Sequence, residues 1–431
     1  MPEHANTSSG HLRVRARGTP ASHKPLSRRA FLQAILAVGL LGACRPARPT
    51  VTPKPVSTTV PGTPKPTFTP LGSPTTPPSP TPTTAPSPTA TLAPSPTSTK
   101  APTLAPSPLP PTRPRIAIAQ AASYDPALVR RQVRDLLDGI GGLGNVLKSG
   151  DRVAIKVNLT GGTHFQAPAG VSATESYMTH PEVVHALGEL LRDAGAREIY
   201  IVEAVYDDAS YRLFGYEQVA RTLGATLIDL NRPDPYPDFA SKAVGTGWFT
   251  YEAFTFNHIL EEVDAFISVA KMKTHCSCGI TASLKNLVGL VPAAHYRLGK
   301  DDWWRSALHG AANETRTRLP RAIIDLNRAR PIDLALIDGI KTSQGGEVPR
   351  GAFAPVQPGV LIAGKDPVAT DAVATAVMGF DPSAAYPTPP FINGDNHLSL
   401  AHDLGLGTNR LEEIEVVGAP IQNVRQGFAP C

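Results

Sequence analysis

The chain has 431 residues, of which 45 are proline, 18% are charged and 6% are aromatic. The prolines concentrate between residues 45 and 112, where Pro, Thr, Ser and Ala dominate and leave too few apolar side chains to form a core. Residues 115–431 hold 29 of the 41 basic but 35 of the 36 acidic residues, a net charge of about −6. A basic nucleic-acid-binding domain is therefore excluded, and no nucleic-acid partner is expected.

Residues 1–43 have the build of an export signal. A basic segment that contains Arg28 and Arg29 precedes an apolar run over 34–43, which is shorter than the roughly 20 residues that span a bilayer. The arginine pair, followed by Phe-Leu, resembles the twin-arginine export motif. We therefore expect the twin-arginine translocase to export the protein; the alternative is a chance arginine pair in an ordinary leader.

The leader ends in Leu-Gly-Ala before Cys44, which resembles the lipobox of bacterial lipoproteins. We expect Cys44 to be lipidated and residues 44–114 to form a disordered, Pro/Thr/Ser-rich linker. In the polyproline II conformation, about 3.1 Å per residue, some seventy residues reach on the order of 200 Å. The prediction is an extracytoplasmic protein that contacts the bacterial membrane through its lipid alone; an incidental cysteine at an ordinary cleavage site is the alternative.

Residues 115–431 are predicted to form one α/β domain. Apolar runs of strand length alternate with runs of helical periodicity. Strands are expected over 153–157, 198–202, 225–229, 332–338 and 360–363, and helices over 180–192, 218–223, 318–327 and 367–377. This alternation predicts a mostly parallel sheet covered by helices on both faces, with ligands bound at the carboxyl ends of the strands.

The segment 263–289 carries the strongest functional signal. It begins as a strand, on which Lys271, Lys273 and His275 project from one face. Crowded cations attract an anion and lower the pKa of a lysine, which suits proton transfer or covalent catalysis. The alternative is a solvated basic strand end that is paired with the surplus acids.

The same segment then changes direction. Gly279 can turn the chain, and Thr281 or Ser283 can cap a helix whose first turns carry Lys285 and Asn286. A helix N-terminus beside lysines is a favourable anion site. We therefore expect these cations to converge in one pocket.

These motifs carry a family resemblance. It rests on Ala-Ile-Lys-Val-Asn at 154–158, His-Pro-Glu-Val-Val at 180–184, Lys-Met-Lys-Thr-His at 271–275, Ser-Leu-Lys-Asn-Leu-Val-Gly at 283–289, Ile-Asp-Gly-Ile at 337–340 and Gly-Lys-Asp-Pro-Val-Ala-Thr-Asp-Ala-Val at 364–373. The chain resembles domain-of-unknown-function family 362, which includes twin-arginine-exported members and whose activity is not established in general. Many relatives carry a fused ferredoxin-like module.

The cysteines depart from that pattern. After Cys44 only Cys276, Cys278 and Cys431 remain, too few for a ferredoxin-type iron–sulfur cluster, so none is expected. Cys276 and Cys278 could bind a metal together with His275, or they could form a redox pair. The spacing Cys-x-Cys argues against a metal site, because it lacks the two-residue gap of zinc knuckles. The cofactor stays open, with a divalent metal as one alternative.

Three aspartates complete the predicted site. Asp338 ends a strand, Asp366 precedes Pro367 as a helix N-cap, and Asp371 lies one turn further on in an apolar helix. A buried, unpaired carboxylate costs several kcal/mol, so a lysine or a metal is the expected partner of Asp371.

The sequence favours an enzyme that acts on a small anionic molecule, a carboxylate or a phosphate. The expected catalytic residues are Lys271, Lys273, His275 and Lys285, and the expected ligand-binding residues are Lys156, Asn158, Asn286 and His180. Asp338, Asp366 and Asp371 are the supporting carboxylates. The alternative is a non-catalytic surface lipoprotein that binds an anionic ligand or a cell-wall polymer.

Overall fold

The computed structural model describes residues 113–431. The predicted leader, the lipidated Cys44 and the linker lie outside the described residues. No helix within residues 113–431 combines the length and apolar character needed to cross a membrane.

The strands in chain order are β1 (Arg115–Gln120), β2 (Arg152–Lys156), β3 (Glu198–Glu203), β4 (Thr226–Asp229), β5 (Ala240–Ala243), β6 (Ala253–Phe256), β7 (Ala265–His275), β8 (Gly279–Thr281), β9 (Leu334–Gln344), β10 (Ala354–Val356), β11 (Val360–Gly364) and β12 (Glu415–Gly418). The α-helices are α2 (Pro126–Gly139), α3 (Pro181–Asp193), α4 (Ser210–Leu213), α5 (Tyr216–Leu223), α6 (Ile259–Glu262), α7 (Ser306–His309), α8 (Arg318–Ala329), α9 (Pro367–Val377), α10 (His397–Asp403) and α11 (Ile421–Val424). Four short 3₁₀ helices are η1 (Gly162–His164), η2 (Lys285–Leu290), η3 (Ala293–His295) and η4 (Leu411–Glu413).

The main sheet has the strand order β12-β1-β11-β9-β7-β2-β3-β4. The block from β9 through β7, β2 and β3 to β4 is parallel throughout, whereas β11 runs antiparallel to both of its neighbours. The prediction of a mostly parallel α/β sheet is confirmed. Its parallel block matters for function because all of its strands end at the same edge.

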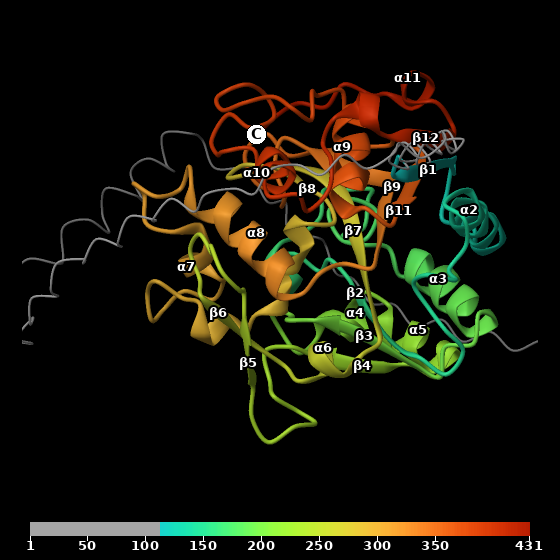
Figure 1. Cartoon of the computed structure of the whole chain (residues 1–431), viewed down its shortest axis with the longest axis horizontal. Coiled ribbons are helices and arrows are strands. Elements are labelled where there is room, and N and C mark those ends of the chain that lie inside the picture. Colours follow the sequence, from blue (N-terminus) through green and yellow to red (C-terminus); the bar gives the residue numbers. More distant parts are fainter. Residues whose placement is uncertain (1–112) are drawn as a thin grey trace, which may run out of the picture. The chain divides into compact units, whose positions relative to one another are not determined.

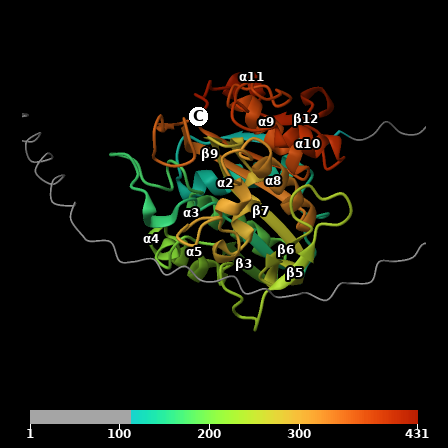
Figure 2. The same ribbon diagram turned by 90° about the vertical axis from the view of Figure 1, so that its left-hand side faces the viewer.

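Helices cover both faces of the sheet. Helices α2, α3 and α5 bury one face, and α8, α9 and α10 bury the other (Figure 1). Figure 2 views the molecule from the side of α8. Along β2 the side chains alternate between the two cores, with Ile155 packed under α3 and Ala154 in the core that contains α8. A helix layer covers each face of the sheet because the strands carry apolar side chains on both faces.

The nine predicted helices and strands outside segment 263–289 are all present, with boundaries shifted by a few residues. The predicted helix with a Thr281 or Ser283 cap is wrong. Gly279 does turn the chain at φ +82°, but the chain then forms β8, which pairs back on β7, and continues into the 3₁₀ helix η2 without a side-chain cap. The backbone N–H groups of Ser283 and Leu284 donate instead to Asp371 of α9.

Candidate functional site

A cleft of about 730 Å³ lies at the carboxyl ends of the parallel strands. Each strand contributes through its last residue or the loop that follows it: Asn158 after β2, Glu203 at the end of β3, His275 at the end of β7 and Glu347 after β9. Parallel strands end at one edge, so residues far apart in sequence meet there. The volume is typical of a site for a small organic ligand.

Lys156 is a fully buried cation in the wall of this cleft. Its ammonium lies 3.0 Å from Glu203 and donates to the carbonyl of Val157 at 2.7 Å and to Asn286 at 3.2 Å. Burial lowers the pKa of Lys156 to about 8, although the Glu203 carboxylate opposes the shift. Asn158 donates to the same oxygen of Asn286 at 3.2 Å, so these predicted ligand-binding residues form one hydrogen-bonded group.

Lys285 and Arg305 also line the cleft, and neither has a carboxylate partner among residues 113–431. Lys285 makes no side-chain hydrogen bond there, and burial lowers its pKa. Arg305 is 1% exposed and donates only to the carbonyls of Val291 at 2.7 Å and Ala204 at 2.5 Å. Two partly or fully buried cations without a counter-ion therefore face the same space.

Two histidines line the same cleft and carry their ring protons on different nitrogen atoms. The N–H of Ser277 donates to Nδ1 of His275 at 3.1 Å, which assigns the ring proton of the neutral imidazole to Nε2. Nδ1 of His309 lies 3.1 Å from the carbonyl of Arg305 and donates to it, which leaves Nε2 as an acceptor. Burial lowers the pKa of both rings, that of His309 to about 4, so both are neutral at pH 7. Together they offer one proton donor and one acceptor.

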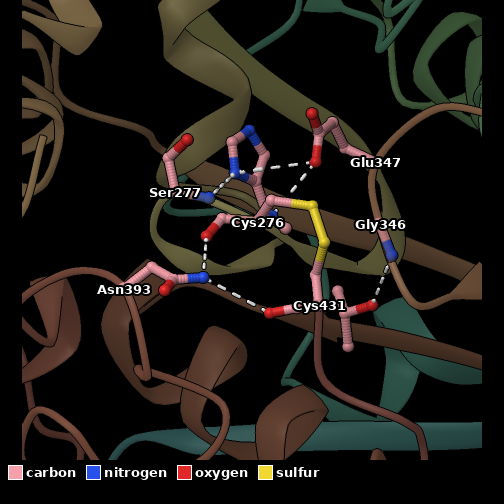
Figure 3. The surroundings of a disulfide bond; sticks show 8 residues. Cys276, Ser277, Gly346, Glu347, Asn393 and Cys431 are labelled. Carbon is pink, nitrogen blue, oxygen red and sulfur yellow. Dashed lines mark hydrogen bonds and ion pairs between the residues drawn. A yellow bond between two sulfur atoms is a disulfide. The ribbon is translucent and has the colours of Figure 1, made fainter. Parts of the chain in front are cut away.

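A disulfide joins Cys276 and Cys431 (Figure 3). Both residues line the cleft. Asn393 links the two half-cystines by donating to the carbonyl of Cys276 at 2.9 Å and to that of Cys431 at 3.3 Å. Glu347 accepts the N–H of Cys276 at 3.1 Å. The proposed Cys276–Cys278 pair is therefore wrong, and Cys276 has no free thiolate for a metal.

Cys278 lies apart from the disulfide, with its thiol in the apolar core and 3.5 Å from the carbonyl of Ile280. Burial raises the pKa of Cys278 to about 12, so the thiol is protonated and a poor ligand. No group of three or more His, Cys, Asp or Glu side chains within residues 113–431 is arranged to hold a metal ion.

Lys271 and Asp338 form a separate buried centre that does not line the cleft. Their charged groups are 2.7 Å apart, and Lys271 also donates to the hydroxyl of Tyr124 and to the carbonyls of Thr174 and Lys341 at 2.9–3.0 Å. The expected proximity of Asp338 to a lysine is present. The expectation that Lys271 would share a pocket with Lys156 and Lys285 is wrong.

The strand register explains why Lys271 does not reach Lys156, whereas His275, on the same face of β7 as Lys271, lines the cleft as the last residue of the strand. Lys156 of β2 pairs with Ser268 of β7, and paired residues project from the same face of a sheet. Lys271 is three residues beyond Ser268 and therefore projects from the opposite face, above Val269. Its side chain enters the core beneath α3 rather than the cleft.

Lys273 lies immediately behind the cleft wall. It is fully buried and donates to the carbonyl of Tyr177 and to the hydroxyl of Thr160 at 3.2 Å, and Thr160 itself lines the cleft. Burial lowers the pKa of Lys273 well below its usual range. Lys273 thus borders the site without lining it.

Three further predicted residues have structural partners. His180 caps α3 by accepting the N–H of Glu182 at 3.1 Å, and its ring stacks on Tyr124 at 3.6 Å, away from the cleft. Asp366 caps α9 as predicted, accepting the N–H of Ala369 at 2.9 Å. The lysine or metal partner expected for Asp371 is wrong: this carboxylate accepts two backbone N–H groups and the Ser283 hydroxyl, and burial raises its pKa to about 7.

Sequence reasoning missed Arg305, His309, Glu203 and the tryptophans Trp303 and Trp304, all of which line the cleft. Two signals were present. Glu203 directly follows a predicted strand, where ligand-binding residues of parallel sheets occur. Two of the three tryptophans in the chain adjoin an arginine in a polar loop, an unusual place for large apolar side chains.

The fold and the cleft define an α/β protein with a ligand-sized site at the carboxyl ends of its parallel strands. The chain belongs to the family described as Domain of unknown function (DUF362), which matches residues 153–376.

Relatives and solved structures extend this comparison. The Thylakoid-associated protein sll1697 of Synechocystis sp. is 27% identical over 281 residues, which cover 63% of this chain and 77% of that protein. A solved structure from Thermotoga maritima shares 12% identity at a TM-score of 0.31, with 61% of each chain covered. The lactate racemase apoprotein from Thermoanaerobacterium thermosaccharolyticum shares 11% identity at a TM-score of 0.30, over 57% of this chain and 54% of that one.

Proposed function

We propose that the cleft binds a small anionic molecule, a carboxylate or a phosphate, and that the protein is an enzyme that acts on it. The observation that carries this proposal is the pair Lys285 and Arg305, two cations that face the cleft without a carboxylate. Four Lys or Arg but only two Glu side chains line the cleft, an excess of two positive side-chain charges. An anionic group between the two cations would offset the cost of burying them.

The histidines supply the argument for catalysis. His309 presents an unprotonated Nε2 and His275 a protonated one, and both line the cleft beside the anion-binding cations. Such a pair can accept a proton at one position of a bound molecule and donate one at another. The lowered pKa of Lys285 adds a second candidate base or nucleophile. A neighbouring cation also stabilises negative charge that develops in a transition state.

Binding is tested by isothermal titration calorimetry with a panel of small phosphates and carboxylates. Lys285→Met should weaken binding about tenfold to a hundredfold, because charged hydrogen bonds contribute about 1.5–3 kcal/mol. Lys148→Met removes the same charge from an exposed position before β2, at the other edge of the sheet, and should leave affinity unchanged. Equal losses in both variants would defeat the proposal.

Turnover separates the enzyme from a non-catalytic binder. Mass spectrometry of the bound anion before and after incubation should show a changed product, and His309→Asn should abolish the change while retaining binding. An anion that is bound tightly but recovered unchanged under all conditions would favour the binding lipoprotein.

We also propose that the protein is exported by the twin-arginine route and anchored to the membrane by a lipid on Cys44. The motifs that support this proposal lie outside the described residues. Cys44→Ser should move the protein from the membrane fraction to the soluble fraction with its thermal unfolding unchanged. Replacement of Arg28 and Arg29 by lysine should block export, and continued export would indicate the general secretory pathway.

A further inference from the structure

Four aromatic side chains form part of the lining of the cleft. Trp303, Trp304, Tyr206 and Phe165 all line the cleft. Trp303 is the centre of the group, because its ring lies 5.3 Å from that of Tyr206, in an edge-to-face arrangement, and 6.1 Å from that of Phe165. We call these four residues the aromatic wall.

Trp303 is held in place by neighbouring rings but stays partly accessible. His164 stacks on it with ring centroids 4.2 Å apart, and the residue remains 40% exposed. A large aromatic side chain gains little from folding when it stays this exposed, whereas three supporting rings fix its orientation. Tryptophan side chains that are held rigidly and stay partly exposed are typical of binding surfaces.

The aromatic wall adjoins the cations of the cleft. The guanidinium of Arg305 lies 5.0 Å from the ring centre of Tyr206, which in turn contacts Trp303. Trp304 contacts His309 with ring centroids 4.7 Å apart. A molecule whose charged group lies at Arg305 and Lys285 would therefore place its remaining atoms beside these rings.

The size of the cleft also favours a ligand with more atoms than its charged group. A volume of about 730 Å³ falls in the range of sites that enclose a drug-sized molecule. Inorganic phosphate or a two-carbon acid would fill only a small part of it. The aromatic wall lines part of the space that such a small anion would leave.

We propose that the natural ligand is an anion that carries a planar aromatic or heteroaromatic ring, with its acidic group at Lys285 and Arg305 and its ring against Trp303 and Trp304. This inference rests on the proposed anion-binding function and specifies the class of ligand.

The experiment compares ligands that differ only in the ring. Phenyl phosphate and cyclohexyl phosphate have the same charge and similar size, and benzoate and cyclohexanecarboxylate repeat the comparison for carboxylates. Calorimetry on the wild-type protein should give about threefold to tenfold tighter binding of the aromatic member of each pair. Inorganic phosphate should bind more weakly than phenyl phosphate, and neutral benzamide should not bind.

The variants locate the preference. Trp303→Leu should remove the difference between phenyl and cyclohexyl phosphate but leave the affinity for inorganic phosphate unchanged, which also shows that the cleft is intact. Trp303→Phe keeps a ring and should keep most of the preference. Trp248→Leu is the matched control, because Trp248 is 45% exposed and does not line the cleft.

The outcomes separate the two proposals. If phosphates or carboxylates bind but aromatic and saturated rings bind equally, or if the preference survives in Trp303→Leu, the aromatic ligand class is wrong and anion binding stands. If no anion binds the wild-type protein, the proposed function fails and this inference fails with it.

Discussion

Two groups of buried cations, both supplied in part by the segment 263–289, differ in their partners. Lys271 is surrounded by four oxygen atoms, one of them from Asp338 at 2.7 Å. Lys285 has no hydrogen-bond or ion-pair partner among residues 113–431, and Arg305 has two carbonyl groups and the ring of Tyr206 but no carboxylate there. The first group is electrostatically complete within the protein, whereas the second has no carboxylate partner within the described residues.

This difference separates structural from functional lysines better than burial does. Burial lowers the pKa of both Lys271 and Lys285, so the pKa shift alone does not distinguish them. The hydrogen-bond and ion-pair partners of the two ammonium groups do distinguish them, because a protein gains no stability from burying a cation that it leaves unpaired. Under the proposed function, such a cation is retained for the anion that it binds.

Among the proposed variants, substitution in the Lys271–Asp338 centre should lower the free energy of unfolding most. Lys271→Met leaves the Asp338 carboxylate buried without its cation, and we expect the free energy of unfolding to fall by about 3–5 kcal/mol. Urea unfolding followed by circular dichroism measures the change. The double variant Lys271→Met/Asp338→Asn should lose less than the sum of its two single variants. A loss below about 1 kcal/mol in Lys271→Met would contradict a structural role.

The disulfide should have the next largest effect. Cys276 and Cys431 are 155 residues apart in sequence, so their bond restricts the unfolded chain strongly. Cys431→Ser should lower the free energy of unfolding by about 2–4 kcal/mol. A reducing agent should destabilise the wild-type protein by a similar amount and leave Cys431→Ser unaffected. If reduction destabilises both equally, its effect does not act through this bond.

Sequence patterns predicted the sheet and half of the site. Apolar runs such as 153–157 and 360–363 specify their own strands, and the rule that ligands bind at carboxyl ends placed Lys156, Asn158 and His275 together. The patterns did not predict that Lys271 would lie outside this group. The face from which its side chain projects, relative to Lys156, depends on the pairing of Lys156 with Ser268, and strand register is a tertiary property.

The remaining residues depend on contacts that a sequence does not contain. Arg305 and Trp303 reach the cleft through a loop without periodicity, and loops are positioned by what they pack against. Three cysteines in the body allow three pairings, and only the path of the C-terminal segment decides among them: Ala429 bonds to Gln344 and Gly345 at the end of β9, which brings Cys431 to Cys276.

The lowered pKa of Lys156 should make the free energy of unfolding depend on pH. Its pKa is lowered from 10.5 to about 8, first because of burial, so the folded protein releases this proton before the unfolded chain does as the pH rises. The free energy of unfolding should therefore gain a contribution between about pH 8 and 10.5, at most about 3 kcal/mol, that is absent below pH 8. Lys156→Met removes the titrating group, so its curve should rise less over this interval. Parallel curves for the two proteins would contradict the lowered pKa.

The smallest effect on stability should come from Lys285, one of the two residues that carry the proposed anion binding. Lys285 has no partner to lose, so Lys285→Met should change the free energy of unfolding by less than about 0.5 kcal/mol, or stabilise the protein by removing an unpaired charge near Arg305. Urea unfolding in parallel with Lys271→Met measures the contrast directly. A loss of several kcal/mol in Lys285→Met would assign it a structural role like that of Lys271. A stable variant with weakened anion binding separates the two classes of lysine, because stability is lost at one position and ligand affinity at the other.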